Sequence, residues 1–412
     1  MLITFKRSGL LRLPVFITLA FALCFNAPTT SRAGRQQDSI QQTQRPRRVG
    51  SEEQKKQTAA SSPASSDEVD EGDVVRVDTQ LVSVPAVVTD STGHPLSNLK
   101  AENFQLLEDG KPQTITNFGT TDAPFEIALL LDTSGSTRED VGLIRDAANS
   151  FIAALRPGDR VGVVAFNSAQ TEKEPIAKVE LLSELTSDRQ SLSNAIGNLG
   201  SSNGTPYYDA LEKVADSIFR QPSTDQVRRR AVVALTDGVD SQSNSDFNTA
   251  KMKLSRAGIA CYFIQVNTED FVEDRLMKDC EDDGRLKLSQ RQLQRYRQLF
   301  APRAKAEDYQ DFCKMGQFEK MSISRELYNL ARREMNDLAK TSGGRSFIAA
   351  DLSDARAAFA RVAADLGTLY SLGYYPTNKA RDGQFRNIKL QLRGLREKAE
   401  IRARDGYYAP KQ

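Results

Sequence analysis

Five short apolar runs alternate with helix-prone segments through the middle of the chain. The strand candidates are Glu126–Asp132, Val161–Phe166, Ala231–Thr236, Ile259–Val266 and Arg345–Ile348. The helix candidates between and after them are Glu139–Leu155, Arg189–Leu199, Tyr208–Phe219, Phe247–Ala257 and Ser324–Thr341. Strands that are apolar on both sides must be buried on both faces, which is typical of a parallel sheet covered by helices. The pattern predicts an α/β fold with a doubly wound, mostly parallel sheet and helices on both faces.

Strand signals with a period of two flank this block on both sides. Apolar residues alternate along Val82–Val88, and Phe104–Leu107 runs into a hairpin turn, with Ile115–Phe118 as the expected returning strand. Beyond the block, Tyr370–Tyr374 and Ile388–Leu392 alternate in the same way. Each group alone is too small to build a sandwich. We therefore expect the two groups to pair, so that the α/β domain is inserted in a small split β-sandwich-like domain.

The N-terminus has the features of an export signal. Lys6 and Arg7 precede the apolar stretch Leu13–Phe25, and Ser31-Arg32-Ala33 fits a small-x-small cleavage site. The apolar stretch is shorter than the roughly 20 residues that a membrane span needs. We expect a secreted, periplasmic or cell-envelope protein, which contacts a membrane only if this segment stays uncleaved as an anchor.

The next 40 residues contain almost no large apolar side chain, so they cannot bury enough area to offset their ordering entropy. The predicted organisation is a signal peptide (1–33), a disordered linker (34–73), the first part of the β domain (74–123), the α/β domain (124–366, with a helical insertion at 267–323) and the second part of the β domain (367–412).

Composition excludes several classes of function. The only histidine among the 412 residues, His94, stands in a turn-like stretch, which argues against Ser-His-Asp hydrolases and histidine-rich zinc sites. The formal net charge of +2 supplies no field for nucleic acid. The chain also has no glycine-rich phosphate loop with a lysine. We therefore expect a protein that is not an enzyme and has no nucleic-acid partner.

Oxygen-bearing side chains follow two of the apolar runs directly. Asp132, Ser134 and Ser136 come after the first run, and Asp237 comes after the run that ends at Thr236. A third segment, Gly204-Thr205-Pro206, precedes a helix candidate. In doubly wound sheets, ligands bind at the carboxyl ends of strands near a switch in strand order. Hydroxyl and carboxylate oxygens suit a hard cation, so the sequence predicts a Mg²⁺ site, with Mn²⁺ or Ca²⁺ as alternatives.

This set of residues resembles the metal-ion-dependent adhesion site of von Willebrand factor A domains, and the resemblance covers roughly residues 124 to 366. It implies that the hydroxyls of Ser134 and Ser136 bind the cation directly, and that Thr205 does so directly or through water. Asp132 and Asp237 would act mainly through water. The open metal position would take an Asp or Glu from a partner protein.

The flanking β segments are similar to those of bacterial secreted proteins with such domains, often met in acidobacteria. The resemblance therefore implies an exported adhesion or scaffolding module that captures a partner carboxylate. The alternative is a structural envelope protein whose metal site only stabilises the fold. The oligomeric state stays open.

Simpler explanations remain for single parts of the pattern. Ser134 and Ser136 could cap the following helix, and Asp237-Gly238 could be a plain turn. The insertion at 267–323 has no counterpart in the minimal domain and either reshapes or covers the binding face. Cys280 and Cys313, which flank part of it, are either a disulfide clip or two unpaired thiols.

Overall fold

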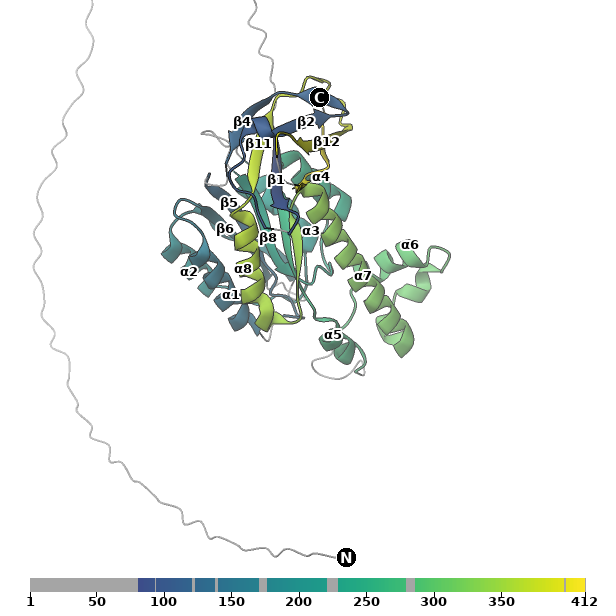
Figure 1. Cartoon of the computed structure of the whole chain (residues 1–412). Helices are drawn as coiled ribbons and strands as arrows, with labels where there is room; N and C mark the ends of the chain where they lie inside the picture. The colour runs from purple at the N-terminus through teal and green to yellow at the C-terminus, as the bar shows by residue number, and fades with distance from the viewer. Residues whose placement is uncertain are drawn as a thin grey trace, which may run out of the picture. The chain divides into compact units, whose positions relative to one another are not determined.

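The computed structural model describes residues 81–411 except Gly93 and residues 121–122, 138–139, 170–175, 221–228, 279–285 and 396–397 (Figure 1). The predicted signal peptide, the predicted linker and Cys280 lie outside the described residues. Within the described part of the chain, no helix is long and apolar enough to cross a membrane.

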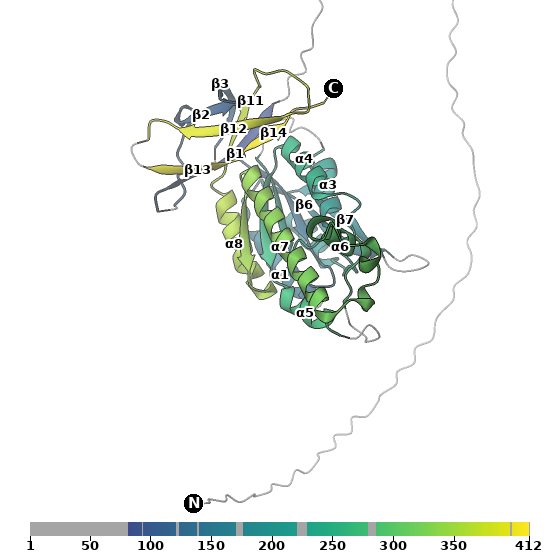
Figure 2. The same ribbon diagram turned by 90° about the vertical axis from the view of Figure 1, so that its right-hand side faces the viewer.

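A β-sandwich is built from both ends of the described chain (Figure 2). Its strands are β1 (Val82–Asp90), β2 (Phe104–Glu108), β3 (Lys111–Gln113), β4 (Ile115–Gly119), β11 (Tyr370–Tyr374), β12 (Phe385–Leu392), β13 (Ala399–Ala403) and β14 (Gly406–Tyr408). One sheet has the order β13-β1-β11-β4 and the other the order β14-β12-β2-β3. Because β1 pairs with β11 and β13, and β2 with β12, the predicted pairing of the two groups is confirmed.

The predicted return of the first hairpin is wrong by one strand. Asp109 and Gly110 both have positive φ, so a two-residue turn places Glu108 opposite Lys111. The returning strand is therefore β3. The segment predicted to return, β4, crosses to the other sheet and pairs antiparallel with β11.

The sandwich core contains one buried acid. Glu108 is 2% exposed, and its Oε2 accepts hydrogen bonds from the hydroxyls of Tyr374 (2.5 Å) and Tyr407 (3.0 Å). The bond from Tyr374 joins β2 to β11 of the other sheet, and the bond from Tyr407 joins β2 to β14 of its own sheet. Both tyrosine rings belong to the apolar core between the sheets. The three side chains therefore tie the two halves of the chain together.

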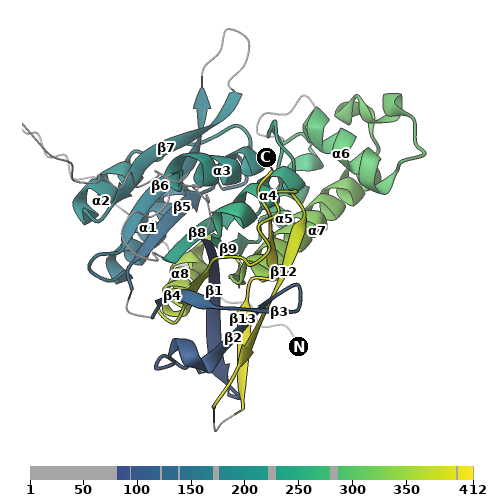
Figure 3. The same cartoon turned by 90° about the horizontal axis from the view of Figure 1, so that it is seen from above.

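The central sheet has the order β10-β9-β8-β5-β6-β7 (Figure 3). Its strands are β5 (Phe125–Leu131), β6 (Arg160–Ala169), β7 (Ile176–Thr186), β8 (Arg229–Thr236), β9 (Ala260–Val266) and β10 (Arg345–Ala349). All neighbours are parallel except β6 and β7. The predicted fold class is confirmed, but the sequence analysis missed β7. This edge strand alternates apolar and charged residues, so it lacks the continuous apolar run of its neighbours.

Helices cover both faces of this sheet. One face packs against α1 (Val141–Ala154), α2 (Arg189–Gly197) and α8 (Ala355–Leu366). The other packs against α3 (Tyr207–Lys213), α4 (Phe247–Ala257) and α7 (Gln317–Ser342). The prediction for α4 is confirmed residue for residue, whereas α7 begins at Gln317 instead of Ser324.

The insertion is helical, as predicted. It contains α5 (Glu269–Leu276), α6 (Gln290–Phe300) and the first turns of α7, and α5 and α6 lie beside α7 (Figure 1). Leu286 precedes α6, which carries Leu293. Cys313 is disulfide-bonded, and Cys261 is a free, buried thiol in β9.

Candidate functional site

The predicted site residues lie where the strand order of the sheet switches, between β5 and β8. Asp132 follows β5 and Asp237 follows β8, and these strands are parallel neighbours with Leu131 opposite Leu235. The backbone N–H of Asp132 donates to the carbonyl of Leu235 at 3.0 Å, which extends the pairing by one residue. After β5 the chain builds β6 and β7 on one side and then crosses to β8 on the other. The two carboxylates therefore lie at the switch in strand order, the usual ligand edge of such sheets.

Asp132 is fully buried, and both of its carboxylate oxygens are occupied. Oδ1 accepts from the backbone N–H of Ser134 at 3.0 Å, and Oδ2 accepts from the hydroxyl of Thr236 at 2.5 Å. Burial and the nearby charge of Asp237 raise the pKa of Asp132 to about 7. Two acids thus share a site whose electrostatics disfavour two negative charges unless a positive charge joins them.

A row of oxygens connects Ser134 to Asp237. The hydroxyls of Ser134 and Ser136 are 3.4 Å apart, and the Ser136 hydroxyl donates to Oδ2 of Asp237 at 2.8 Å. The other oxygen of Asp237, Oδ1, accepts from the backbone N–H of Val239 at 3.0 Å. Ser136 therefore links the loop after β5 to the loop after β8.

Thr205 reaches the same place from a third loop. Its backbone N–H donates to the hydroxyl of Ser241 at 2.8 Å, and its carbonyl accepts from the N–H of Ser241 at 3.0 Å. The side-chain hydroxyl of Thr205 lines a pocket of about 120 Å³ together with Ser134, Ser136 and Asp237. This hydroxyl makes no hydrogen bond to any residue that the structure describes. The structure thus brings four predicted residues to one pocket, with Asp132 buried beside them.

A family model decides what kind of domain carries this pocket. Residues 127–239 match the model of the von Willebrand factor type A domain, and the matched segment spans both acids and all three loops. The chain contains a von Willebrand factor type A domain. No curated protein sequence matches the chain.

Several solved structures are similar to parts of this chain. The conserved hypothetical protein BatB from Bacteroides thetaiotaomicron is 20% identical over 34% of this chain and 66% of its own length, with a TM-score of 0.27. An aerotolerance-related membrane protein from Bacteroides fragilis is 17% identical over 58% of this chain and 98% of its own (TM-score 0.35). A von Willebrand factor type A protein from Catenulispora acidiphila is 13% identical over 81% and 75% (TM-score 0.37).

Sequence reasoning missed two residues that hold Asp237 of the A domain. Thr268, directly after β9, donates its hydroxyl to Oδ2 of Asp237 at 2.7 Å. The hydroxyl of Tyr328 on α7 lies 2.8 Å from that of Thr268. Thr268 follows the end of a third parallel strand, and this position could have predicted it near the site. Tyr328 carries no such local signal, because its place beside Asp237 depends on how α7 packs on the sheet. Oδ2 of Asp237 is therefore fixed by two hydroxyls from different loops.

Asp240, to which the sequence analysis assigned no role, holds the Thr205 loop in place. Its Oδ2 accepts from the backbone N–H of Tyr207 at 2.9 Å, at the start of α3, and its Oδ1 accepts from the N–H of Ser243 at 3.2 Å. Burial raises the pKa of Asp240 to about 6. This carboxylate positions the loop and lies outside the pocket lining.

The insertion covers part of the A-domain pocket. Apolar side chains from it and from α7 line the pocket opposite the hydroxyls: Val272, Leu276, Leu286, Leu288 and Leu327. A Cβ at Gly135 would lie 3.6 Å from Cδ2 of Leu286, so this leucine lies directly over the loop after β5. Lys287 lines the pocket between the two leucines. We expected the insertion either to reshape or to cover the binding face, and in the structure it covers part of it.

The chemistry of the pocket fits a hard divalent cation. In the described ranges, no cluster of three His, Cys, Asp or Glu residues could hold a metal. The A-domain pocket instead offers neutral hydroxyls from Ser134, Ser136 and Thr205, backed by two acids. Such donors are suited to Mg²⁺, which keeps several waters and needs few charged ligands.

Proposed function

We propose that the A domain binds a divalent cation, Mg²⁺ first, and through it a carboxylate of a partner protein. Domains of this family mediate protein–protein interactions, and the pocket at residues 134–136, Thr205 and Asp237 is where such an interaction would centre. The observation that carries the proposal is the convergence of Thr205, whose hydroxyl is bonded to no described residue, with two serine hydroxyls beside the acids Asp132 and Asp237.

Each residue has a defined part in this proposal. Ser134, Ser136 and Thr205 would hold the cation, while Asp132 and Asp237 orient the hydroxyls and supply negative charge. The bound cation would supply a positive centre with one ligand position left for an acid. Neutral ligands preserve most of the cation's charge, so its attraction for a further carboxylate stays strong.

The shape of the pocket narrows the class of partner. A volume of about 120 Å³ is enough for a single side chain. Lys287 adds a positive charge to the lining, and Leu286 and Leu288 add apolar contact. We therefore expect a partner that presents one protruding Asp or Glu flanked by apolar residues.

The structural alternative has an observation of its own. Apolar side chains of the insertion line the pocket, and Leu286 lies over Gly135 in the loop after β5. In this second proposal the cation joins the three loops and the chain is a structural envelope protein. The structural proposal differs from the adhesion proposal in one respect: the cation would stabilise the fold without recruiting a partner protein.

We further propose that the protein is exported and acts in the periplasm, at the cell envelope or outside the cell, without enzymatic activity. The charged start, the apolar stretch up to Phe25 and the small residues at 31–33 support export. The exposure of the single histidine supports a binding role, since His94 lies in an exposed turn of the sandwich, where its Nδ1 is 2.8 Å from the exposed hydroxyl of Thr92.

Thermal unfolding of the full chain in Mg²⁺ and in EDTA tests the metal site. A ligand at one hundred times its Kd stabilises by about 2.7 kcal/mol, so we expect a clear rise in melting temperature for the wild type. Asp132→Ala should lose this rise, and Asp146→Ala, an exposed acid on α1, should keep it. Equal curves with Mg²⁺ and EDTA for the wild type would refute the metal site.

Affinity capture from envelope extract separates the two proposals. A partner retained with Mg²⁺ and lost with EDTA or in Ser134→Ala supports adhesion. A metal-dependent melting temperature without any metal-dependent partner supports the structural alternative.

A further inference from the structure

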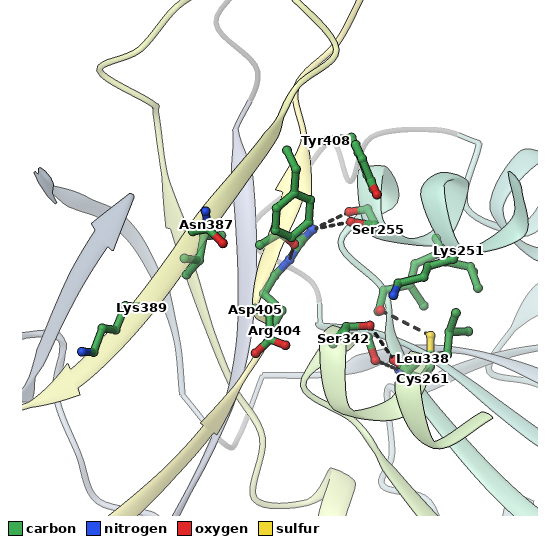
Figure 4. A pocket seen from close by; sticks show the side chains of 16 residues that line it. Lys251, Ser255, Cys261, Leu338, Ser342, Asn387, Lys389, Arg404, Asp405 and Tyr408 are labelled. Carbon is green, nitrogen blue, oxygen red and sulfur yellow. Dashed lines mark hydrogen bonds between the residues drawn. The ribbon is translucent and has the colours of Figure 1, made fainter. Parts of the chain in front are cut away.

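A second, larger cavity lies where the sandwich meets the A domain (Figure 4). Its volume is about 590 Å³, and its lining comes from the ends of α4 and α7, the start of β9, strand β12 and the turn between β13 and β14. It shares no lining residue with the metal pocket. It lies near the amino end of β9, whereas the metal pocket lies at the carboxyl ends of the strands.

A buried cation lines this cavity. Arg404 is 4% exposed, and its guanidinium donates to three backbone carbonyls: Nε to Gly406 at 2.9 Å, Nη1 to Ser83 at 2.8 Å and Nη2 to Ser255. Figure 4 shows the guanidinium directed at Ser255, beside the cavity. Carbonyl oxygens satisfy the hydrogen bonds but carry no charge.

No carboxylate among the described residues lies within 4 Å of this guanidinium. Burial lowers the pKa of Arg404 to about 10, which is the mark of a charge that its surroundings do not balance. Its other neighbour is the ring of Tyr407, whose centroid lies 5.8 Å from the guanidinium carbon. Buried charges in proteins are normally paired with an opposite charge, so an arginine that has no acid partner among the described residues and lies beside an open cavity points to an anion from outside the chain.

The rest of the lining extends the positive charge and adds apolar walls. Lys389 on β12 contributes one further cation, whereas the charge of Lys251 on α4 is paired with Asp337 at 2.5 Å, and the acid Asp405 is exposed. Leu254 and Leu338 belong to the apolar part of the wall. The volume lies within the range of about 300–1,000 Å³ that is usual for small-molecule sites.

We propose that this cavity binds a small amphipathic organic anion. Its carboxylate or phosphate group would pair with Arg404, and its hydrocarbon part would pack on Leu254 and Leu338. The proposal is independent of the metal site, since the two pockets have no residue in common. A ligand here would contact both the A domain and the sandwich, and would therefore strengthen their contact.

Isothermal titration calorimetry with the full chain tests the proposal. The probes are octanoate, octyl phosphate and uncharged octanol, which share one hydrocarbon tail and differ in the head group. We expect one equivalent of octanoate or octyl phosphate to bind, and octanol to bind at least tenfold more weakly. The stronger of the two anions identifies the head group. No binding by either anion, or equal affinity for octanol, would overturn the proposal.

Two substitutions on one strand localise the site without touching the buried arginine. Asn387 and Gln391 are both exposed on β12, but only Asn387 lines the cavity. We expect Asn387→Trp to fill the cavity and abolish binding of the anions, and Gln391→Trp to bind them like the wild type. Unchanged binding by Asn387→Trp, or an equal loss in both variants, would refute the assignment.

Arg404→Gln tests the charge itself. If this variant folds, its affinity for octanoate should fall at least tenfold while its affinity for octanol stays the same. If it does not fold, the pair on β12 still decides the proposal.

Discussion

Replacement of Asp132 by Asn should stabilise the metal-free protein at neutral pH. Asn has no charge at any pH, and its side-chain oxygen can still accept from the backbone N–H of Ser134, as the carboxylate does at 3.0 Å. In EDTA the wild type must bury an ionised carboxylate beside Asp237, and the variant need not. The variant isolates the electrostatic cost of this one group.

The sign and size of the effect follow from the pKa of Asp132, which burial and Asp237 raise from 3.8 to about 7. A raised acid pKa means that the folded protein holds the proton more tightly than the unfolded chain does. The stability that the protonated Asp132 carboxyl contributes to the wild type is therefore fully present below about pH 4 and is lost as the pH rises through about 7. At about 1.4 kcal/mol for each pH unit, the whole window amounts to about 4 kcal/mol.

Melting curves of both proteins in EDTA, taken from pH 4 to pH 8, measure the effect. A folded unit of the size of Val75–Gln412 has an unfolding entropy of about 0.7 kcal/mol per kelvin. The two melting temperatures should nearly coincide at pH 4, and the variant should melt about 6 °C higher at pH 8. Mg²⁺ should raise the melting temperature of the wild type and change that of the variant little. A difference between the two melting temperatures that stays constant from pH 4 to pH 8 would refute the electrostatic explanation, because an uncharged packing effect has no pH dependence.

Two further substitutions test the fold. Tyr374→Phe removes the 2.5 Å hydrogen bond to buried Glu108 and should cost about 1–3 kcal/mol in urea unfolding, whereas Tyr375→Phe, at a 46% exposed neighbour, should cost almost nothing. Gly344→Ala places a Cβ 1.9 Å from a backbone oxygen of β9, so it should lower the melting temperature by several degrees. Gly142→Ala, in α1 with open space around it, should be neutral or stabilising. Equal effects within either pair would contradict the packing described above.

The sequence was sufficient to predict the sheet and the position of the site, for a physical reason. Continuous apolar runs define strands buried on both faces, and polar residues directly after such runs must lie at one edge of a parallel sheet. Asp132 and Asp237 could therefore be placed together without any knowledge of loop geometry. Thr205 followed from its position before a helix candidate, and the structure places it on the same pocket.

What the sequence did not reveal depends on contacts between distant segments. β7 is half-exposed at the edge, so its apolar pattern resembles that of a loop or a surface helix. The contact of Tyr328 with Thr268 depends on how α7 docks, and no local pattern encodes docking. The burial of Arg404 was equally unpredictable, because arginine is normally exposed unless it is paired.

The strand pairing of the sandwich also sets an order of folding. The hydroxyls of Ser83 on β1 and Ser371 on β11 lie 3.2 Å apart, although 288 positions separate them along the chain. Contacts of such long range form slowly, and β1 emerges from synthesis long before its partners exist. Its unpaired edge must stay free of aggregation until the A domain has collapsed and drawn the two ends of its own segment together. The A domain thereby brings the two parts of the sandwich together, and a chain cut short before Tyr370 would leave β1 without its partners β11 and β13.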